Sequence, residues 1–334
     1  MPALWPCCAA AAAGCPLLGA ALRYWWPVPA GPYMIPDAVL SFWQDAFAER
    51  PRRRRCRTQR WEEPSLCPAG RGHWSAEQLR AALPGFARLY ARRPLRRNGN
   101  GMNTNHAFSL FFTARALRPR HIIESGAYRG QSTWILRQAA GPEAWIYVLD
   151  PYDHLVYRDN ASARTQYFVG RAGFQDFGQI DWDSLIPAED RAHTLVVIDD
   201  HQSILRRMRE MLRYGFVHVW SDDNDKHLTG DYSFNLMCTP LTPSEESAGV
   251  IYRDNFGTSS VTLSAKEHAA NLAYLLEHLE TYFEFPPILD GCGRLPNPLL
   301  SNETQLAELG LPPVEQDEYS YWSKRPPYVR LIKK

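Results

Sequence analysis

Several features that mark particular classes of protein are missing from this sequence. Its seven cysteines are an odd number and form no Cys-x-x-Cys pair, so neither a disulfide framework nor a zinc site is expected, and a reducing compartment is favoured. The formal net charge is only +1, which gives no reason to expect a nucleic acid as a partner. With 45% hydrophobic and 22% charged residues, the 334-residue chain is expected to be globular.

The first 95 residues differ in composition from the rest. They are rich in alanine, proline, arginine and tryptophan without a sustained period, and we expect a weakly structured leader with short helices at 36–49 and 75–90. An apolar run at 7–22 is too short for a confident membrane span and is similar to the core of a signal peptide, although no Lys or Arg precedes it. Arginine-rich runs follow at 50–57 and 91–97. The leader is therefore either a targeting or anchoring segment or a plain extension.

Location and membrane contact depend on this leader. The protein is expected in the cytoplasm, or in an organelle if the leader is a transit peptide. Association with a membrane is expected only through the apolar run at 7–22.

From about residue 96 to the end at 334, helix-like and strand-like segments alternate. Apolar runs predict strands at 121–124, 145–149, 165–169, 194–200 and 216–223. Helices are predicted at 105–116, 131–139, 204–213 and 265–282. This alternation indicates an α/β domain with a Rossmann-like, doubly wound, mostly parallel sheet and helices on both faces, preceded by the irregular N-terminal extension.

Polar residues lie at or just beyond the end of each predicted strand. In a doubly wound sheet the ligand lies beyond the carboxyl ends of the strands, so these residues are candidates for a site. They are Glu124, Asp150, Gln175 and Asp176, Asp199 to His201, and Asp222 to Asn224.

The stretch HIIESGAYRGQSTWIL, residues 121–136, reads as a strand, a glycine loop and a helix start. Asp150 lies 20 residues beyond Gly130, where a carboxylate can accept hydrogen bonds from both hydroxyls of a ribose. A dinucleotide site would carry the G-x-G-x-x-G pattern, which this loop lacks, and Glu124 would repel a phosphate. S-adenosylmethionine, with its ammonium group and ribose, suits these residues better. The alternative is a tight turn that needs glycine for its own backbone.

Four short motifs carry a resemblance to a known family. Residues 124–132 (ESGAYRGQS) resemble the E-x-G-A-Y-x-G-x-S loop of catechol O-methyltransferase and related class I S-adenosylmethionine-dependent methyltransferases. Residues 173–176 (GFQD) resemble the segment of that family that borders the adenine. Asp200-His201 and Asp223-Asn224 resemble its two metal motifs. The layout is also similar to metal-dependent macrocin, macrolide and sugar O-methyltransferases and to cephalosporin-hydroxylase-like proteins.

The resemblance implies roles for these residues. It places Glu124 near the amino group of the cofactor, Tyr128 and Ser132 on its carboxylate, Asp150 on the ribose, and Gln175 with Asp176 and His201 beside the adenine. Gly126 and Gly130 belong to the same cofactor loop. Asp200, Asp223 and Asn224, together with Asp222, would bind Mg²⁺ or another divalent cation, which lowers the pKa of the acceptor hydroxyl. Asp and Asn after strands are, alternatively, ordinary turn and cap residues.

One departure from the family leaves the catalytic base open. The catechol enzymes have a lysine three residues after the metal-binding aspartate, and this chain has Ser203 there. The remaining catalytic candidates are Asp199, Asp200 and His201. His218 is expected to be a core histidine, and the aromatic residues Trp220, Tyr232 and Phe234 are expected to serve packing.

The expected function is S-adenosylmethionine-dependent, metal-assisted O-methylation of a small hydroxylated molecule or sugar. Two alternatives remain: a metal-dependent hydroxylase or hydrolase on the same fold, and a non-catalytic module that binds the cofactor.

Overall fold

The computed structural model describes residues 65–67, 73–96, 98, 101–222, 224, 231–254, 259–289, 297–313 and 325–332. All of them belong to one unit of the chain, Gln44–Lys334. The apolar run 7–22, the predicted helix 36–49 and the arginine-rich run 50–57 lie outside the described residues, so the expectations for them stay predictions.

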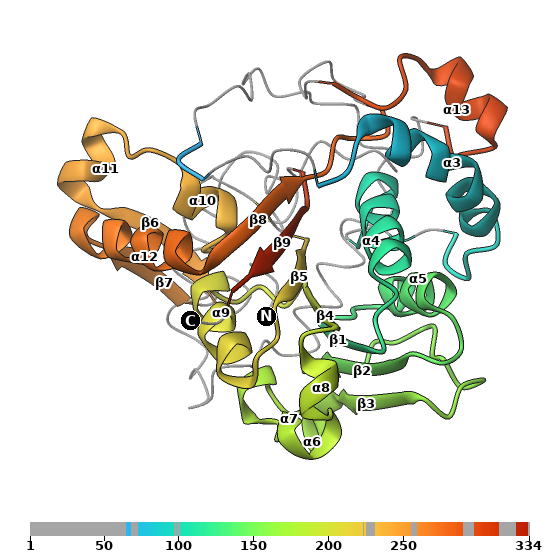
Figure 1. Cartoon of the computed structure of the whole chain (residues 1–334), viewed down its shortest axis with the longest axis horizontal. Helices are drawn as coiled ribbons and strands as arrows, with labels where there is room; N and C mark the ends of the chain where they lie inside the picture. Colours follow the sequence, from blue (N-terminus) through green and yellow to red (C-terminus); the bar gives the residue numbers. More distant parts are fainter. Residues whose placement is uncertain are drawn as a thin grey trace, which may run out of the picture. The chain divides into compact units, whose positions relative to one another are not determined.

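A seven-stranded sheet forms the centre of the fold, in the order β3-β2-β1-β4-β5-β9-β8 (Figure 1). Strands β1 to β5 are parallel, whereas β9 is antiparallel to both of its neighbours. A separate hairpin is formed by β6 and β7. The strands are β1 His121–Ser125, β2 Trp145–Asp150, β3 Thr165–Val169, β4 Thr194–Ile198, β5 His218–Ser221, β6 Val250–Asp254, β7 Ser259–Leu263, β8 Leu279–Glu284 and β9 Pro327–Leu331.

Helices connect the strands and cover the sheet. The longer ones are α3 Ala76–Tyr90, α4 Thr104–Leu117, α5 Gln131–Ala140, α9 Ile204–Tyr214 and α12 Ala265–His278. The shorter ones are α6 Gly170–Gly173, the 3₁₀ turn η2 Phe177–Gln179, α7 Trp182–Leu185, α8 Ala188–Arg191, α10 Phe234–Cys238, α11 Pro243–Ala248 and α13 Glu303–Leu309.

Two hydrophobic cores lie on opposite faces of the sheet. Because successive side chains of a strand point to opposite faces, Ile122 enters the core with α4 and α5, and Ile123 enters the core with α9. In β4, Val197 enters the first of these cores and Val196 enters the second. Continuous apolar strands covered on both faces are typical of a doubly wound α/β fold. The predicted fold class is confirmed.

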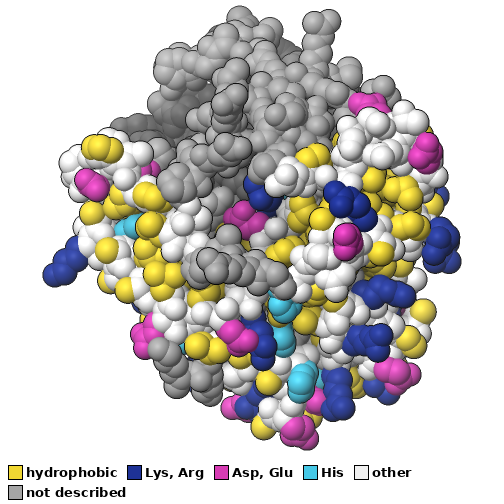
Figure 2. All heavy atoms as spheres, turned by 45° about the horizontal axis from the view of Figure 1, so that its top comes forward, with side chains coloured by type: hydrophobic (Ala, Val, Ile, Leu, Met, Phe, Trp, Pro, Cys, Tyr) yellow, Lys and Arg dark blue, Asp and Glu magenta, His cyan; other side chains and the backbone are white. Residues whose placement is uncertain are grey.

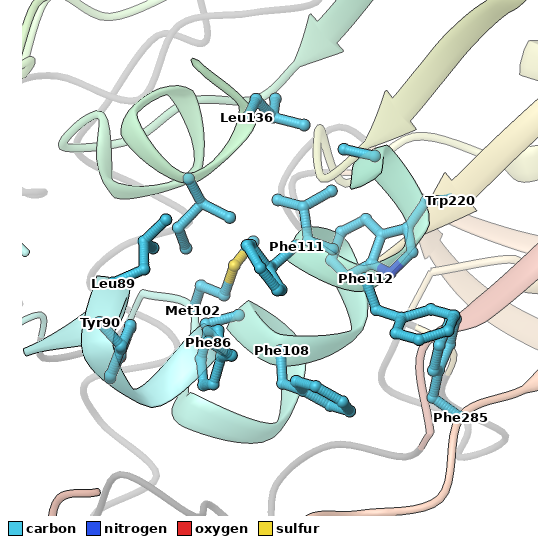
Figure 3. Close-up of a cluster of buried hydrophobic side chains, with 14 of the residues drawn as sticks. Phe86, Leu89, Tyr90, Met102, Phe108, Phe111, Phe112, Leu136, Trp220 and Phe285 are labelled. Atoms are coloured by element: carbon cyan, nitrogen blue, oxygen red, sulfur yellow. The ribbon is translucent and has the colours of Figure 1, made fainter. Parts of the chain in front are cut away.

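Helix α3 packs in the core although it lies in the segment expected to be a leader. Ser75 caps it through a capping box with Gln78, as its sequence indicates. Its Phe86 ring lies 5.5 Å from Phe111 of α4 (Figure 3). Burial of Leu79, Leu83 and Phe86 to 1% exposure or less explains why this helix is ordered on the domain.

Some predicted boundaries differ from the observed ones. β4 ends at Ile198 and β5 spans only His218–Ser221, so Asp199, Asp200 and Asp222 lie beyond the strands rather than in them. The helix predicted at 265–282 ends at His278, and Leu279–Glu284 form β8 instead. Pairing of β8 with β9 outweighs the helical pattern because it places Tyr282 in the second core, 3% exposed.

The expectation of no disulfide is wrong. Cys67 and Cys238 are bonded across 171 residues, with their Cα atoms 5.1 Å apart. Each side chain is buried, and the amide of Leu66 donates to the carbonyl of Cys238 at 2.6 Å. Sequence spacing could not indicate this pair, because a disulfide depends on proximity in the fold. A disulfide persists mainly in an oxidising environment, which departs from the reducing compartment inferred from the cysteine pattern.

The described surface mixes charges of both signs. On the face shown in Figure 2, basic side chains lie among acidic and apolar ones, in keeping with the formal net charge of +1. Within the described ranges, no helix combines the length and the apolar character that crossing a bilayer requires.

Candidate active site

The strand order reverses at β1. On one side of β1 the sheet continues with β2 and β3, and on the other side it continues with β4 and β5. Ligands of doubly wound sheets bind beyond the carboxyl ends of the strands at such a switch point. The residues at this place are the glycine loop after β1 and the turn after β4.

Close approach of the chain to itself explains the two loop glycines. Gly126 has a φ of +91°, and a Cβ there would lie 2.0 Å from the carbonyl oxygen of Asp199. Gly130 has a φ of +88°, and its Cβ would lie 2.3 Å from the carbonyl oxygen of Tyr157. Both glycines are therefore required by backbone conformation and packing. This favours the tight-turn interpretation of the glycines themselves and leaves the ligand to be judged from the side chains.

Glu124, at the end of β1, is fully buried. Its carboxylate accepts hydrogen bonds from the hydroxyls of Thr133, at 2.6 Å, and Ser132, both in the first turn of α5. Its Oε1 has no hydrogen-bond partner in the described structure. Burial first, and then the negative charge of Asp150, raise the pKa of Glu124 to about 7.

Asp150 ends β2 and holds the glycine loop. Its Oδ2 accepts from the amides of Ala127 and Tyr128 at 3.0 and 2.8 Å, and its Oδ1 accepts from the amide of Tyr152 at 2.9 Å. Burial raises the pKa of this carboxyl, and the three amides oppose that rise. Each carboxylate oxygen can accept more than one hydrogen bond, so this arrangement keeps capacity for a ligand hydroxyl.

Two more side chains near the loop have buried polar atoms without a hydrogen-bond partner in the described structure. Gln131, the first residue of α5, is 2% exposed, and neither atom of its amide has a hydrogen-bond partner. The buried Nε2 of His154, which follows β2, also has none. Buried polar groups are nearly always paired with protein or water, so these atoms after β1 and β2 are available to the polar groups of a ligand.

The other residues predicted to bind the cofactor have varied surroundings. Tyr128 is half-buried with a φ of +49°, and Ser132 is buried beside Glu124. Gln175 is exposed in the segment before η2. Exposure and backbone conformation do not test whether these three side chains contact the cofactor, so the contacts stay predictions.

Asp176 and Asp200 are joined by a buried arginine. Arg207, in α9, donates from Nη2 to Asp176 Oδ1 at 2.7 Å and from Nε to Asp200 Oδ2 at 2.8 Å. Although burial opposes ionisation of both groups, their mutual attraction holds the pKa of Asp176 below its usual range and that of Arg207 well above it. Asp176 therefore serves this ion pair, and nothing in its contacts places it beside an adenine.

His201 follows Asp200 in the turn after β4 and has a carboxylate partner of its own. Its Nδ1 lies 3.0 Å from Oδ2 of Asp231, and its side chain is 39% exposed. The backbone of His201 has a φ of +51°, which is uncommon for a side-chain-bearing residue. Asp199 contributes its backbone here, since its amide donates to the carbonyl of Ser125 at 2.8 Å. The turn thus presents an imidazole with a carboxylate partner at the switch point.

Three of the side chains predicted to bind Mg²⁺, those of Asp200, Asp222 and Asn224, are described, and each is engaged with other parts of the chain. Asp200 Oδ2 also accepts from Ser125 Oγ at 2.5 Å, and its Oδ1 accepts from the amide of Gln202. Asp222 Oδ1 lies 2.5 Å from Nδ1 of His106.

Asn224 uses its Oδ1 for the amide of Asn235 and its Nδ2 for Tyr282, Glu284 and the carbonyl of Arg325. Asp223 lies outside the described residues. Among the residues that the structure describes, no group of three or more His, Cys, Asp or Glu side chains is placed to hold a metal ion.

Sequence reasoning missed several of these contacts. His106 and Arg207 were not considered, because their partners lie 116 and 31 residues away in sequence. The pairing of Asp231 with His201, 30 residues away, had no local signal either. The packing role predicted for three aromatic residues is confirmed, since Trp220, Tyr232 and Phe234 are 1% exposed or less. His218, expected in the core, is only partly buried, and its Nδ1 lies 2.7 Å from the hydroxyl of Tyr328.

Comparison with known proteins gave structural matches only. No family model matches the chain, and no curated protein sequence matches it. A putative O-methyltransferase from Klebsiella pneumoniae is 14% identical, with 77% of this chain and 92% of that chain covered and a TM-score of 0.36. The O-methyltransferase from Bacillus cereus in complex with SAH is 12% identical, with coverages of 76% and 91% and a TM-score of 0.36.

A third match is TomG, an O-methyltransferase from Streptomyces achromogenes in complex with SAM, at 16% identity, coverages of 65% and 86%, and a TM-score of 0.34. Scores this low do not establish a relationship. The fold and the switch-point site define a doubly wound α/β protein, and its function is inferred below from its own residues.

Proposed function

We propose that this protein is an S-adenosylmethionine-dependent methyltransferase that acts on an oxygen of a small hydroxylated molecule. The observation that carries the proposal is the pair of buried carboxylates, Glu124 and Asp150, beside the glycine loop at the switch point. Two carboxylates so placed disfavour a phosphate and favour a cationic ligand. S-adenosylmethionine combines an ammonium and a sulfonium group with ribose hydroxyls.

The unpaired polar atoms support the same ligand. Glu124 Oε1 can accept a hydrogen bond from an ammonium group, and Asp150 can accept from ribose hydroxyls. The amide of Gln131 and the imidazole of His154 are further partners for the polar groups of a nucleoside that carries an amino acid. A dinucleotide would instead bring a pyrophosphate next to Glu124.

The chemistry requires one proton to be removed from the acceptor. When bound, S-adenosylmethionine supplies an electrophilic methyl group. His201 is the proposed base: with Nδ1–H directed to Asp231, its Nε2 can accept the proton of the acceptor hydroxyl. Asp231 holds the ring in that tautomer and stabilises the imidazolium, as a carboxylate partner does in other enzymes. Mg²⁺ forms no part of the proposal, because the described side chains expected to bind it are engaged with the chain.

Ligand-induced stabilisation tests the cofactor. The melting temperature of the full chain is measured with S-adenosylmethionine, S-adenosylhomocysteine, NAD and buffer alone. A ligand at about 100 times its dissociation constant stabilises a protein by about 2.7 kcal/mol. The two S-adenosyl compounds should raise the melting temperature and NAD should not; the reverse result refutes the proposal.

Two variants refine that experiment. Asp150→Asn should weaken binding of S-adenosylhomocysteine. The matched control is Asp153→Asn, because Asp153, three residues after Asp150, is an exposed carboxylate that pairs with Arg158. A protein that binds the cofactor but methylates none of a panel of catechols, hydroxy acids and sugars would favour the alternative of a non-catalytic binding module.

A further inference from the structure

Arg207 is among the most deeply buried charged side chains described, with 1% of its surface exposed. It lies in the first turns of α9, seven residues after Asp200. Besides Asp200 and Asp176, its guanidinium contacts Glu210 Oε2, at 2.7 Å from Nη1. One cation thus bridges three carboxylates from the turn after β4, the segment before η2 and its own helix.

The charge of this cluster requires the guanidinium. The side chains of Asp176 and Asp200 are only 2% and 8% exposed, and that of Glu210 is 20% exposed. Ionised carboxylates this close repel one another unless a cation lies between them. Arg206 adds a second positive charge from the edge, where it contacts Asp176 and Glu210 with 40% of its side chain exposed.

Arg207 also fixes the turn that carries His201. Asp200 receives the Nε–H of Arg207 on the oxygen that also accepts from Ser125 Oγ, and its other oxygen accepts from the amide of Gln202. The chain Arg207–Asp200–Ser125 therefore connects α9 to the ends of β4 and β1. His201 lies between Asp200 and Gln202, so its backbone is held on both sides.

We propose that Arg207 occupies the place of a catalytic metal in this protein: the guanidinium neutralises and orients Asp200, and no divalent cation binds there. The inference rests on the proposed function only where it concerns methyl transfer. The metal-dependent O-methyltransferases that the sequence resembles use a cation at the aspartate that matches Asp200, and here a covalently attached cation replaces it.

A divalent ion cannot readily take over this position. Mg²⁺ requires near-octahedral oxygen ligands and gives up its water with difficulty. To bind Asp200 it would have to displace a buried guanidinium and leave that charge without its partner, which is strongly unfavourable. Asp222 and Asn224, the other described side chains expected to bind the metal, are engaged with His106 and Asn235.

Direct binding of Mn²⁺ tests the inference without any assay of activity. Full-length protein treated with EDTA is titrated with Mn²⁺, and free Mn²⁺ is followed by electron paramagnetic resonance. The wild type should take up no Mn²⁺, and its melting temperature should be the same in EDTA and in Mn²⁺. Binding of one Mn²⁺ per chain that is lost in Asp200→Asn would overturn the inference.

A gain of metal binding provides the second measurement. Arg207→Met removes the cation and keeps a straight, apolar side chain, so Asp176, Asp200 and Glu210 are left to share a new cation. This variant should be stabilised by Mn²⁺, whereas Arg206→Met, which retains the buried guanidinium, should not respond. If Arg207→Met folds and is not stabilised by Mn²⁺, the guanidinium does not occupy a cation site and the inference fails.

If Arg207→Met does not fold, Arg207→Lys is used instead. This variant keeps the charge, so like the wild type it should bind no Mn²⁺, and Mn²⁺ binding by it would refute the inference.

Activity separates this inference from the proposed function. Methyl transfer should proceed at the same rate in EDTA as in Mg²⁺. Loss of transfer in EDTA with intact binding of S-adenosylhomocysteine would overturn the role of Arg207 and leave the methyltransferase proposal standing. Failure to bind S-adenosylhomocysteine would overturn the methyltransferase proposal and leave the Mn²⁺ result unaffected.

Discussion

Gly126 and Asp199 meet backbone to backbone at the switch point of the sheet. The φ of Gly126 is +91°, and a Cβ on this residue would lie 2.0 Å from the carbonyl oxygen of Asp199. The same turn carries Asp200 and His201, so the approach of Gly126 sets how near the glycine loop lies to both proposed functional side chains. Gly126 therefore links the packing of β1 and β4 to the geometry of the site.

Replacing Gly126 tests this contact. Gly141 is a matched control, because its φ is +89° but a Cβ there would meet nothing within 4 Å. Gly141→Ala should lose about 1 to 3 kcal/mol of unfolding free energy, the cost of its backbone conformation alone, with φ +89° and ψ 178°. Gly126→Ala should lose clearly more, because the clash with Asp199 is added. Urea denaturation of both variants gives the comparison, and equal losses would mean that the two backbones can move apart.

The parallel half of the fold could be predicted from the sequence because its signals are local. Runs such as 194–198 (TLVVI) are apolar on both faces, as buried parallel strands are, and they appear in the structure at the expected places. The antiparallel half was missed. Residues 279–284 extend a helical pattern, and they form a strand only because 327–331, far away in sequence, pair with them.

The residues of the site also differ in whether the sequence alone could predict them. Glu124 and Asp150 were recognised because each lies at the carboxyl end of an apolar strand, a feature that is visible in sequence. The partners of Asp200 and His201 were not, because Arg207 and Asp231 reach them through tertiary structure. An aspartate in sequence has the same appearance whether its partner is a metal ion or a buried guanidinium.

Loss of the disulfide should destabilise the protein. Cys67→Ala, Cys238→Ala and the double variant should each lose about 2 to 4 kcal/mol of unfolding free energy, because the bond closes a long loop in the unfolded chain. Guanidinium denaturation measures the loss, and reductant should bring the wild type down to the level of the variants. If mass spectrometry of unreduced peptides finds no link between Cys67 and Cys238, this prediction is wrong.

His201 should control the chemical step and not the binding of the cofactor. His201→Asn is the suitable change, because asparagine tolerates the left-handed backbone that His201 adopts. The rate of methyl transfer should fall by roughly 10²- to 10⁴-fold, the usual contribution of a general base. The dissociation constant of S-adenosylhomocysteine should not change.

Two further variants accompany His201→Asn. Asp231→Asn should also slow methyl transfer, because it removes the carboxylate that orients the ring. His193→Asn, at an exposed histidine just before β4, should have no effect. A His201→Asn protein with the full rate would exclude the imidazole as the base.

Glu124 should make the stability of the ligand-free protein fall as pH rises. Burial raises the pKa of Glu124 to about 7 in the folded protein, above its ordinary value of 4.5. The folded state therefore binds more protons than the unfolded state between these values, and stability that is present at low pH is lost as pH rises through about 7. Glu124→Gln, which cannot ionise, should flatten this part of the stability profile. If urea denaturation gives Glu124→Gln and the wild type the same dependence of stability on pH across this range, Glu124 ionises normally.

The same carboxyl should give cofactor binding the opposite dependence on pH. An ammonium group binds the ionised form of Glu124, so below pH 7 binding must also remove a proton from this residue. Affinity for S-adenosylhomocysteine should therefore rise by up to about tenfold per pH unit and level off above about 7. Calorimetric titrations between pH 5.5 and 8.5, roughly one and a half units on each side of that pKa, measure this dependence.

Glu124→Gln should bind S-adenosylhomocysteine more weakly by about 10- to 100-fold, because a hydrogen bond to a charged group is lost, and its affinity should not depend on pH in this way. Asp153→Asn should keep the slope, and a wild type whose affinity does not change with pH would place the ammonium group elsewhere.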